Sequence, residues 1–162
     1  MKIVSDASPL IFLAKSGLIL KALEGNTIFI PPSVQEEVSN GKFTDAHLIK
    51  TLVKGGKILV RDPAVKDDYI LLGVGESEAI NLAIELKPDF LLIDEAKGRR
   101  IARNLGLATL GTLGMLNQLL KRGKITKSDA FVAIHKLKES KYYLHPSILE
   151  AFIEKIKNYE EK

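Results

Sequence analysis

The 162-residue sequence contains no cysteine and no tryptophan. The absence of cysteine excludes disulfide bonds and thiolate-ligated zinc, and it is compatible with a reducing cytoplasm, where we expect the protein to act. Glutamine is also scarce, whereas lysine and glutamate are abundant. This combination favours a thermophilic source.

Long hydrophobic runs are absent as well. The most apolar region, residues 9–23, is interrupted by Lys15 and Lys21, whereas a membrane-spanning helix needs about 18 consecutive apolar residues. Asp6 interrupts the apolar N-terminus, so we expect no secretory signal. The sequence therefore predicts no membrane association.

The composition is that of a globular protein, with 46% hydrophobic and 27% charged residues. We find no linker, internal repeat or low-complexity segment, so residues 1–162 are predicted to form a single domain. The formal net charge is +4, which is compatible with nucleic-acid binding without establishing it.

Short, uniformly apolar segments alternate with segments of helical periodicity. This pattern is typical of a parallel sheet that is covered on both faces. We predict an α/β fold with three α/β/α layers, a central parallel sheet of four or five strands and a helical C-terminal third. The predicted strands are residues 2–5, 27–30, 57–61, 90–94 and 107–111. The predicted helices are a region that starts with Ser8 as cap and ends at Gly17 or Gly25, then 33–41 with Ser33 as cap, 44–56, 75–87, 95–106, 112–123, 127–141 and 145–162.

Acidic residues gather at one predicted edge of this sheet. Asp6 and Asp94 end two strands, and Glu37, Glu76 and Glu78 lie on helices that start at the same edge. Ligands of open parallel sheets bind outside the carboxyl ends of the strands. Each acid also has a structural explanation, because the aspartates could cap the helices that follow them and the glutamates could complement helix dipoles or face solvent.

Convergence of four acids, Asp6, Glu37, Glu76 and Asp94, favours a functional interpretation. Their mutual repulsion would be costly unless a cation lay among them. Oxygen ligands suit Mg²⁺ or Mn²⁺, and carboxylate-bound magnesium can support displacement at phosphorus. The pattern therefore indicates a metal-dependent site for phosphoryl transfer.

Five short segments occur in an order and spacing that resemble the PIN domain, the Mg²⁺-dependent ribonuclease fold of VapC-type toxins. They are SDASPLI, IPPSVQEEV, GESEAINLA, LLIDEAKGRRIA and GTLGML, and they extend from residue 5 to about residue 116. The resemblance implies cleavage of single-stranded RNA, with Asp6, Glu37, Glu76 and Asp94 as catalytic acids and Glu36 as an exposed neighbour. It also implies that an antitoxin protein is a partner.

The match to the family pattern is incomplete around the last aspartate. Many members have a hydroxyl residue two positions before it and a further acid two positions after it, where this chain has Leu92 and Ala96. Glu78 resembles the paired acids of flap-endonuclease sites, so the predicted metal ligands are Asp6, Glu76, Asp94 and Glu78. These differences indicate a divergent subgroup.

A nuclease needs cations that bind the phosphate backbone. Arg99, Arg100 and Arg103, with Lys97, follow Asp94 on one predicted helix, although a solvated basic face or bridges to glutamates would explain them equally well. Among hydroxyl residues, Ser8 and Thr112 are candidates for contacts with phosphate or water. For Thr112 the alternative is to cap the helix that it begins.

The remaining features carry little chemistry. His47, His135 and His145 share no spacing, and Tyr142 with Tyr143 could stack on bases but more often packs a chain reversal. An apolar stripe on the last helix favours core packing, with a homodimer contact as the alternative: Ile148, Phe152, Ile153, Ile156 and Tyr159.

Other nucleotide-binding motifs fit poorly. The segment GVGESE lacks the third small residue of a dinucleotide fingerprint, and the sequence contains no GxxxxGK[ST] phosphate loop. The principal alternative to a ribonuclease is an inactive PIN scaffold that binds RNA or a protein partner.

Overall fold

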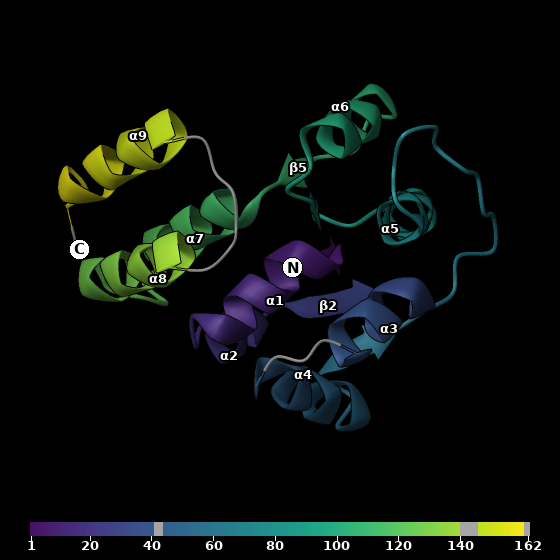
Figure 1. Cartoon of the computed structure of the whole chain (residues 1–162), viewed down its shortest axis with the longest axis horizontal. Coiled ribbons are helices and arrows are strands. Elements are labelled where there is room, and N and C mark those ends of the chain that lie inside the picture. Colours follow the sequence, from purple (N-terminus) through teal and green to yellow (C-terminus); the bar gives the residue numbers. More distant parts are fainter. Residues whose placement is uncertain (41–43, 140–145, 161–162) are drawn as a thin grey trace.

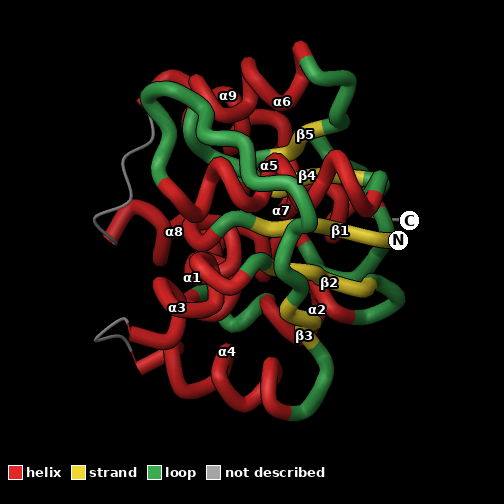
Figure 2. The backbone as a smooth tube through the Cα atoms, turned by 90° about the vertical axis from the view of Figure 1, so that its right-hand side faces the viewer, coloured by secondary structure: helices red, strands yellow, loops and turns green. Residues whose placement is uncertain are grey.

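The computed structural model describes residues 1–40, 44–139 and 146–160. Its five strands form one parallel sheet in the order β3-β2-β1-β4-β5. Figure 2 shows the strands stacked in this order, with β3 at one end and β5 at the other. The strand bounds are β1 (Lys2–Ser5), β2 (Thr27–Ile30), β3 (Ile58–Val60), β4 (Phe90–Leu92) and β5 (Thr109–Leu110). The predicted parallel sheet is therefore confirmed, and its last three strands are shorter than predicted.

The central strands bury both of their faces. In β1, Ile3 belongs to one hydrophobic cluster and Val4 to the other. The same alternation continues through Leu91, Leu92 and Ile93, because successive side chains of a strand point to opposite faces. Helices therefore cover both faces of the sheet, which confirms the three-layer α/β/α architecture (Figure 1).

Nine helices lie within the described residues, and their bounds are α1 (Ala7–Lys15), α2 (Ile19–Leu23), α3 (Pro32–Asn40), α4 (Thr44–Lys54), α5 (Val74–Leu86), α6 (Ala96–Asn104), α7 (Thr112–Lys121), α8 (Lys127–Glu139) and α9 (Pro146–Lys157). Helices α5 and α6 pack on one face, through the smaller cluster. The larger cluster on the other face contains residues of α1 to α4 and α7 to α9.

Two predicted helix starts are wrong by one or two residues. Helix α1 begins at Ala7, with Asp6 in the N-cap position, so Ser8 is not the cap. Helix α3 begins at Pro32, which places Ser33 inside the first turn. A proline is well accommodated at the first helical position because its fixed φ suits the helix and its missing N–H would have no partner there. The predicted end of this helix at Gly41 lies outside the described residues.

The first helical region divides into two helices at the two glycines that the sequence left open. Helix α1 ends before Gly17, and α2 ends before Gly25. Both glycines have positive φ, at 78° and 73°, a conformation that glycine adopts without the steric penalty of a side chain. Each glycine therefore ends one helix.

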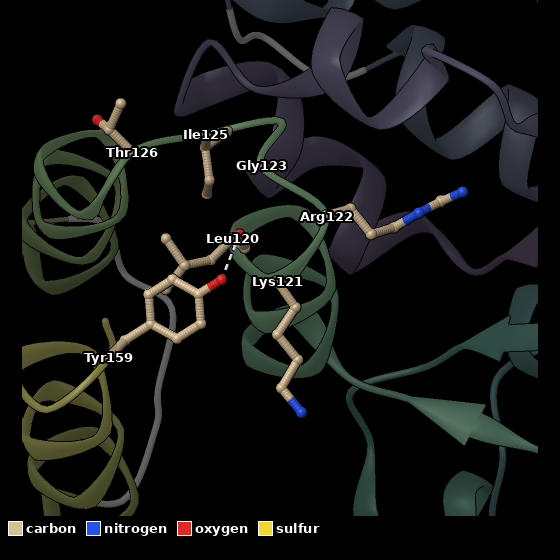
Figure 3. A pocket seen from close by; sticks show the side chains of 7 residues that line it. All are labelled: Leu120, Lys121, Arg122, Gly123, Ile125, Thr126 and Tyr159. Carbon is tan, nitrogen blue, oxygen red and sulfur yellow. Dashed lines mark hydrogen bonds between the residues drawn. The ribbon is translucent and has the colours of Figure 1, made fainter. Parts of the chain in front are cut away.

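The C-terminal third is helical, as predicted, and α9 packs against the core. Phe152 and Ile156 are buried, and Ile153 and Tyr159 pack beside them. A pocket of about 370 Å³ lies at the junction of α7, α8 and α9, and there the Tyr159 hydroxyl donates to the Leu120 carbonyl over 3.2 Å. Figure 3 shows this pocket and the hydrogen bond. Of the predicted apolar stripe, only Ile148 is largely exposed, so core packing explains most of it.

The strand order creates a topological switch point between β1 and β4. After β1 the chain continues to β2 and β3 on one side, and after β4 it continues to β5 on the other. The connections leave the two adjacent strands in opposite directions, which opens a crevice at their carboxyl ends. Asp6 directly follows β1, and Asp94 lies two residues after β4.

Candidate active site

Asp6 is the most buried acid at this edge, with 5% of its surface exposed. Its backbone N–H donates to the Leu92 carbonyl over 2.9 Å, which ties the end of β1 to β4. Although Asp6 occupies the N-cap position of α1, its side chain makes no capping hydrogen bond in the described part of the chain. Asp6 thus occupies the cap position that the structural explanation requires, but no side-chain capping hydrogen bond accounts for its carboxylate.

Burial raises the pKa of the Asp6 carboxyl to about 7. The Ala7 N–H opposes this shift, whereas the charges of Glu76, Glu37 and Asp94 add to it. An acid surrounded by acids holds its proton more tightly, because each neighbouring negative charge disfavours ionisation. The four acids that we selected from the sequence thus lie within electrostatic reach of one another.

A pocket of about 610 Å³ opens beside Asp6. The residues that line it are Asp6, Ser8, Ser33, Glu36, Glu37, Gly73, Val74, Gly75 and Glu76. Gly75 lies between two of the carboxylates. A methyl group built on its Cα would lie 3.5 Å from Glu37 Oε2 and 3.7 Å from Asp6 Oδ1. The lack of a side chain at Gly75 therefore leaves space where both carboxylates approach.

Glu76 has a structural contact at the mouth of the pocket. Its Oε2 accepts a hydrogen bond of 2.8 Å from the Gly73 N–H, the residue before α5. This is the back-bond by which a glutamate in the first turn satisfies the N-terminus of its own helix. One of the two carboxylate oxygens of Glu76 therefore stabilises the N-terminus of α5, as the structural explanation of this residue requires.

Asp94 is held by the start of α7. Its Oδ1 accepts from the Thr112 N–H and its Oδ2 from the Thr112 hydroxyl, both over 2.7 Å. A Cβ on Gly111 would lie 2.8 Å from Asp94 Oδ1, so the close approach depends on a glycine there. Glu95, not Asp94, caps α6 by accepting from the Gly98 N–H over 2.7 Å. The N-cap of α7 is Gly111, so the capping assignments of Asp94 to α6 and of Thr112 to α7 are both wrong.

Glu78 faces a different set of groups. Its Oε2 accepts from the Ser33 hydroxyl over 2.5 Å and from the Ser33 N–H over 3.2 Å, and Oε1 lies 3.8 Å from Lys66 Nζ. Neither Glu78 nor Asp94 is among the described residues that line the pocket. The sequence could not reveal these contacts, because Ser33 lies 45 residues away.

We predict that Glu78→Gln changes the affinity for Mn²⁺ by no more than about threefold, because its carboxylate is bonded to Ser33 instead of facing Asp6. The matched variant Glu76→Gln, on the same helix, should weaken Mn²⁺ binding at least about tenfold. Isothermal titration of both proteins measures the difference. An equal loss of Mn²⁺ affinity in the two variants would show that Glu78 is a metal ligand after all.

The basic residues of α6 differ in exposure, since Arg99 is half-buried and Lys97, Arg100 and Arg103 are exposed. Arg99 Nη1 donates to the backbone carbonyls of Asp94 and, over 3.4 Å, Ile93, and Arg103 Nε donates to the Thr109 hydroxyl over 2.8 Å. Lys97 and Arg100 are exposed on the same helix. Arg99 thus supports the loop that carries Asp94, a role that the sequence did not suggest.

The remaining predicted residues fall outside the site or outside the described chain. Ser8 is half-buried and lines the pocket. His47 is exposed, and His135 lies 3.5 Å from Glu139 on the surface of α8. His145, Tyr142 and Tyr143 lie outside the described residues.

The pocket suits a hard cation that keeps part of its water shell. Among residues 1–40, 44–139 and 146–160, no group of three or more Asp, Glu or His is arranged as a complete metal-binding set. The polar side chains lining the pocket are carboxylates and hydroxyls, which are ligands of Mg²⁺ or Mn²⁺, and magnesium is commonly bound through one or two carboxylates with several waters. Asp6 and Glu37, facing each other over Gly75, fit that requirement.

Comparison with known proteins agrees with this architecture. The sequence matches a family model described as PIN domain over residues 2–158. The fold is similar to that of a PilT N-terminus domain protein from the hyperthermophilic archaeon Sulfolobus solfataricus P2, with a TM-score of 0.55 and 22% sequence identity. That match covers 74% of this chain and 94% of the archaeal chain. No curated protein matches the sequence.

The helices of the described residues include none that is long and apolar enough to cross a membrane.

Proposed function

The chain belongs to the PIN domain family, a nuclease-type fold, and we propose that it is a metal-dependent endoribonuclease that cleaves single-stranded RNA. One observation carries the proposal. A buried carboxyl, Asp6, lies at the switch point of a parallel sheet and within the field of three further acids. Such an arrangement is costly for stability, and a bound cation would offset that cost.

The acids have distinct roles in the proposed reaction. Asp6 and Glu37 would bind Mg²⁺ or Mn²⁺ in the pocket, and the negative charge of Glu76 at its mouth would strengthen that binding. The cation supplies positive charge that stabilises the negative charge developing on the scissile phosphate. Asp94, fixed by two hydrogen bonds from Thr112, would orient the attacking water or complete the site. Ser8 lies on the pocket wall, where its hydroxyl can donate to a phosphate oxygen.

Cations on α6 would bind the RNA backbone. Lys97, Arg100 and Arg103 are exposed on α6, the helix that follows Asp94. Phosphate contacts of this kind position a strand without reading its sequence. The contribution of Arg99 would be indirect, through the Asp94 loop that it supports.

Two partner assignments accompany the proposal. As the toxin of a toxin–antitoxin pair acting in the cytoplasm, the protein would be bound by an antitoxin that covers its acidic pocket. A homodimer would use exposed apolar side chains such as Ile148 on α9. The antitoxin follows from the resemblance to VapC-type toxins and is tested by co-purification. The homodimer follows from the apolar stripe on the last helix and is tested by light scattering.

The alternative is a PIN scaffold that binds RNA or a protein without cutting. It is favoured by the lack of a complete metal-binding set among the described residues. It also agrees with the two bonds that Thr112 already donates to Asp94.

A cleavage assay separates the two functions. Protein stripped with EDTA is incubated with a 5′-labelled single-stranded RNA of about 30 nucleotides, and with the matching DNA and duplex RNA, in Mg²⁺, Mn²⁺ or EDTA. We expect internal cleavage of single-stranded RNA with either ion, no cleavage in EDTA, and activity that co-elutes with the protein on gel filtration. Binding without cleavage would support the scaffold, and cleavage in EDTA would overturn the metal-dependent mechanism.

A further inference from the structure

The connection between β3 and α5, residues 61–73, exposes an unusual concentration of apolar side chains. Ile70 is 85% exposed, Leu71 77% and Val74, the first residue of α5, 69%. Figure 1 shows this connection curving along the outside of the molecule before it enters α5, and in Figure 2 it faces the viewer. Apolar side chains that are exposed to this extent and lie close together in the chain are typical of surfaces that bind another molecule.

The backbone holds the two outermost side chains in place. The Leu72 N–H donates to the Tyr69 carbonyl over 3.0 Å, closing a turn with Ile70 and Leu71 at its tip. Leu71 has a φ of 75°, the position of such a turn that normally requires glycine. A leucine in this conformation is sterically disfavoured, and residues of this kind concentrate at functional surfaces.

Residues on both sides of the turn attach it to α5 and to the core by hydrogen bonds and packing. The Tyr69 hydroxyl donates to Asn81 Oδ1 over 3.1 Å, and Asn81 Nδ2 donates to the Asp67 carbonyl over 2.9 Å. Tyr69 and Leu72 pack against the cluster beneath α5. Tyr69 and Leu72 therefore flank the exposed Ile70 and Leu71 and attach the turn to the protein through packing and hydrogen bonds.

The charge around the turn is opposite to that of the whole chain. Residues 61–78 contain five acids and two bases, whereas the formal net charge of the protein is +4. Both bases are already paired, since Lys66 lies 2.7 Å from Asp62 and Arg61 lies 3.1 Å from Glu85. Asp67 and Asp68, directly before the turn, are exposed. This surface repels the phosphates of RNA and attracts basic side chains.

We propose that Ile70, Leu71 and Val74 form a docking site for a partner protein, which binds through a segment that is both basic and apolar. Apolar side chains of that segment pack on the turn, and its lysines or arginines face Asp67 and Asp68. Rigid apolar anchors with a charged rim are typical of protein interfaces. Val74 also lines the candidate active-site pocket, so the docking site borders that pocket, whereas Ile70 and Leu71 are not among the residues that line it. The existence of the docking site does not depend on nuclease activity.

A peptide selection tests the site directly. A random 12-residue peptide library is selected on the full protein in EDTA, so that RNA cleavage plays no part. We expect enriched peptides that combine lysine or arginine with leucine or aromatic residues. Fluorescence anisotropy with one synthesised peptide should show at least tenfold weaker binding to Ile70→Asp, a variant that adds a negative charge. A purely electrostatic contact would instead be strengthened, so the loss isolates the apolar anchor.

Control variants at other exposed positions show whether a loss of peptide binding is specific to Ile70. Val132→Asp, at an exposed valine on α8, should leave the peptide affinity unchanged, and Asp67→Asn with Asp68→Asn should weaken it. Circular dichroism of each variant establishes that the fold is retained. The proposal is overturned if the enriched peptides bind the Ile70→Asp variant with the same affinity as they bind the parent protein. It is also overturned if the variant binds a 12-nucleotide oligouridine more weakly than the parent does while its affinity for the peptides is unchanged. Failure here would leave the cleavage assay unaffected.

Discussion

In metal-free buffer at pH 8, Asp6→Asn is expected to stabilise the protein by about 4 kcal/mol. The parent must ionise a buried carboxyl whose pKa is about 7 in the folded state, against 3.8 for the unperturbed group. Asparagine has nearly the same shape and carries no charge, so the variant avoids this cost. For a chain of this length the gain corresponds to a rise of about 10 °C in the unfolding midpoint. Thermal unfolding in EDTA, followed by circular dichroism, measures it.

The gain should depend on pH with a definite sign. Between pH 4 and pH 7 the unfolded chain has lost the Asp6 proton while the folded protein retains it. The parent therefore loses stability as the pH rises through this window, because the folded state binds more protons. The difference between variant and parent should grow from below about 1 kcal/mol at pH 4 to its full size near pH 8. Addition of Mn²⁺ should raise the midpoint of the parent alone.

Asp94→Asn provides the contrasting variant. The Asp94 carboxylate accepts two hydrogen bonds from Thr112, and an asparagine has only one acceptor oxygen. This substitution should cost about 1–2 kcal/mol. A lower midpoint for Asp6→Asn, in the same buffer, would show that its carboxylate supports α1 and would remove the main reason for placing a cation beside it.

The fold and the four central acids were predictable because they depend on local patterns. Buried strands are marked by apolar runs such as that of residues 2–5, and parallel strands necessarily bring their carboxyl ends to one edge. Asp6 and Asp94 could therefore be placed together without knowledge of any side-chain contact. Glu37 and Glu76 were added because their predicted helices start at the same edge. The resemblance to the PIN domain, now supported by the family match over residues 2–158, implied a catalytic role for all four acids.

What the sequence could not provide depends on contacts between distant segments. Ser33 bonds Glu78, and Thr112 holds Asp94 from 18 residues away. No periodicity encodes such pairs. Helix starts were misplaced for a related reason, since Asp6 and Ser8 are equally good cap residues and only the geometry of the strand end decides between them. The exposed turn at Ile70 was not predicted either, because an apolar run is read as buried until its exposure is known.

The largest effect on activity is expected for the same substitution that stabilises the fold. Asp6→Asn should lower the rate of single-stranded RNA cleavage at least about a thousandfold, since it removes the most buried of the proposed ligands. Loss of function together with a gain in stability is the signature of a residue that is kept for function at a cost to the fold. A merely structural aspartate would lose both.

Glu36 and Glu37 allow this interpretation to be tested within one helix turn. Both residues line the pocket and carry the same charge, but Glu37 is the one that acts on the pKa of Asp6 and approaches it over Gly75. Glu37→Gln should therefore reduce cleavage at least about a hundredfold, whereas Glu36→Gln should stay within about threefold of the parent. Single-turnover rates at saturating Mn²⁺ measure both. Equal losses of activity in the two variants would contradict the assignment of Glu37 as a metal ligand. They would show that cleavage depends on the total negative charge of the pocket, because the two substitutions remove the same charge from different positions.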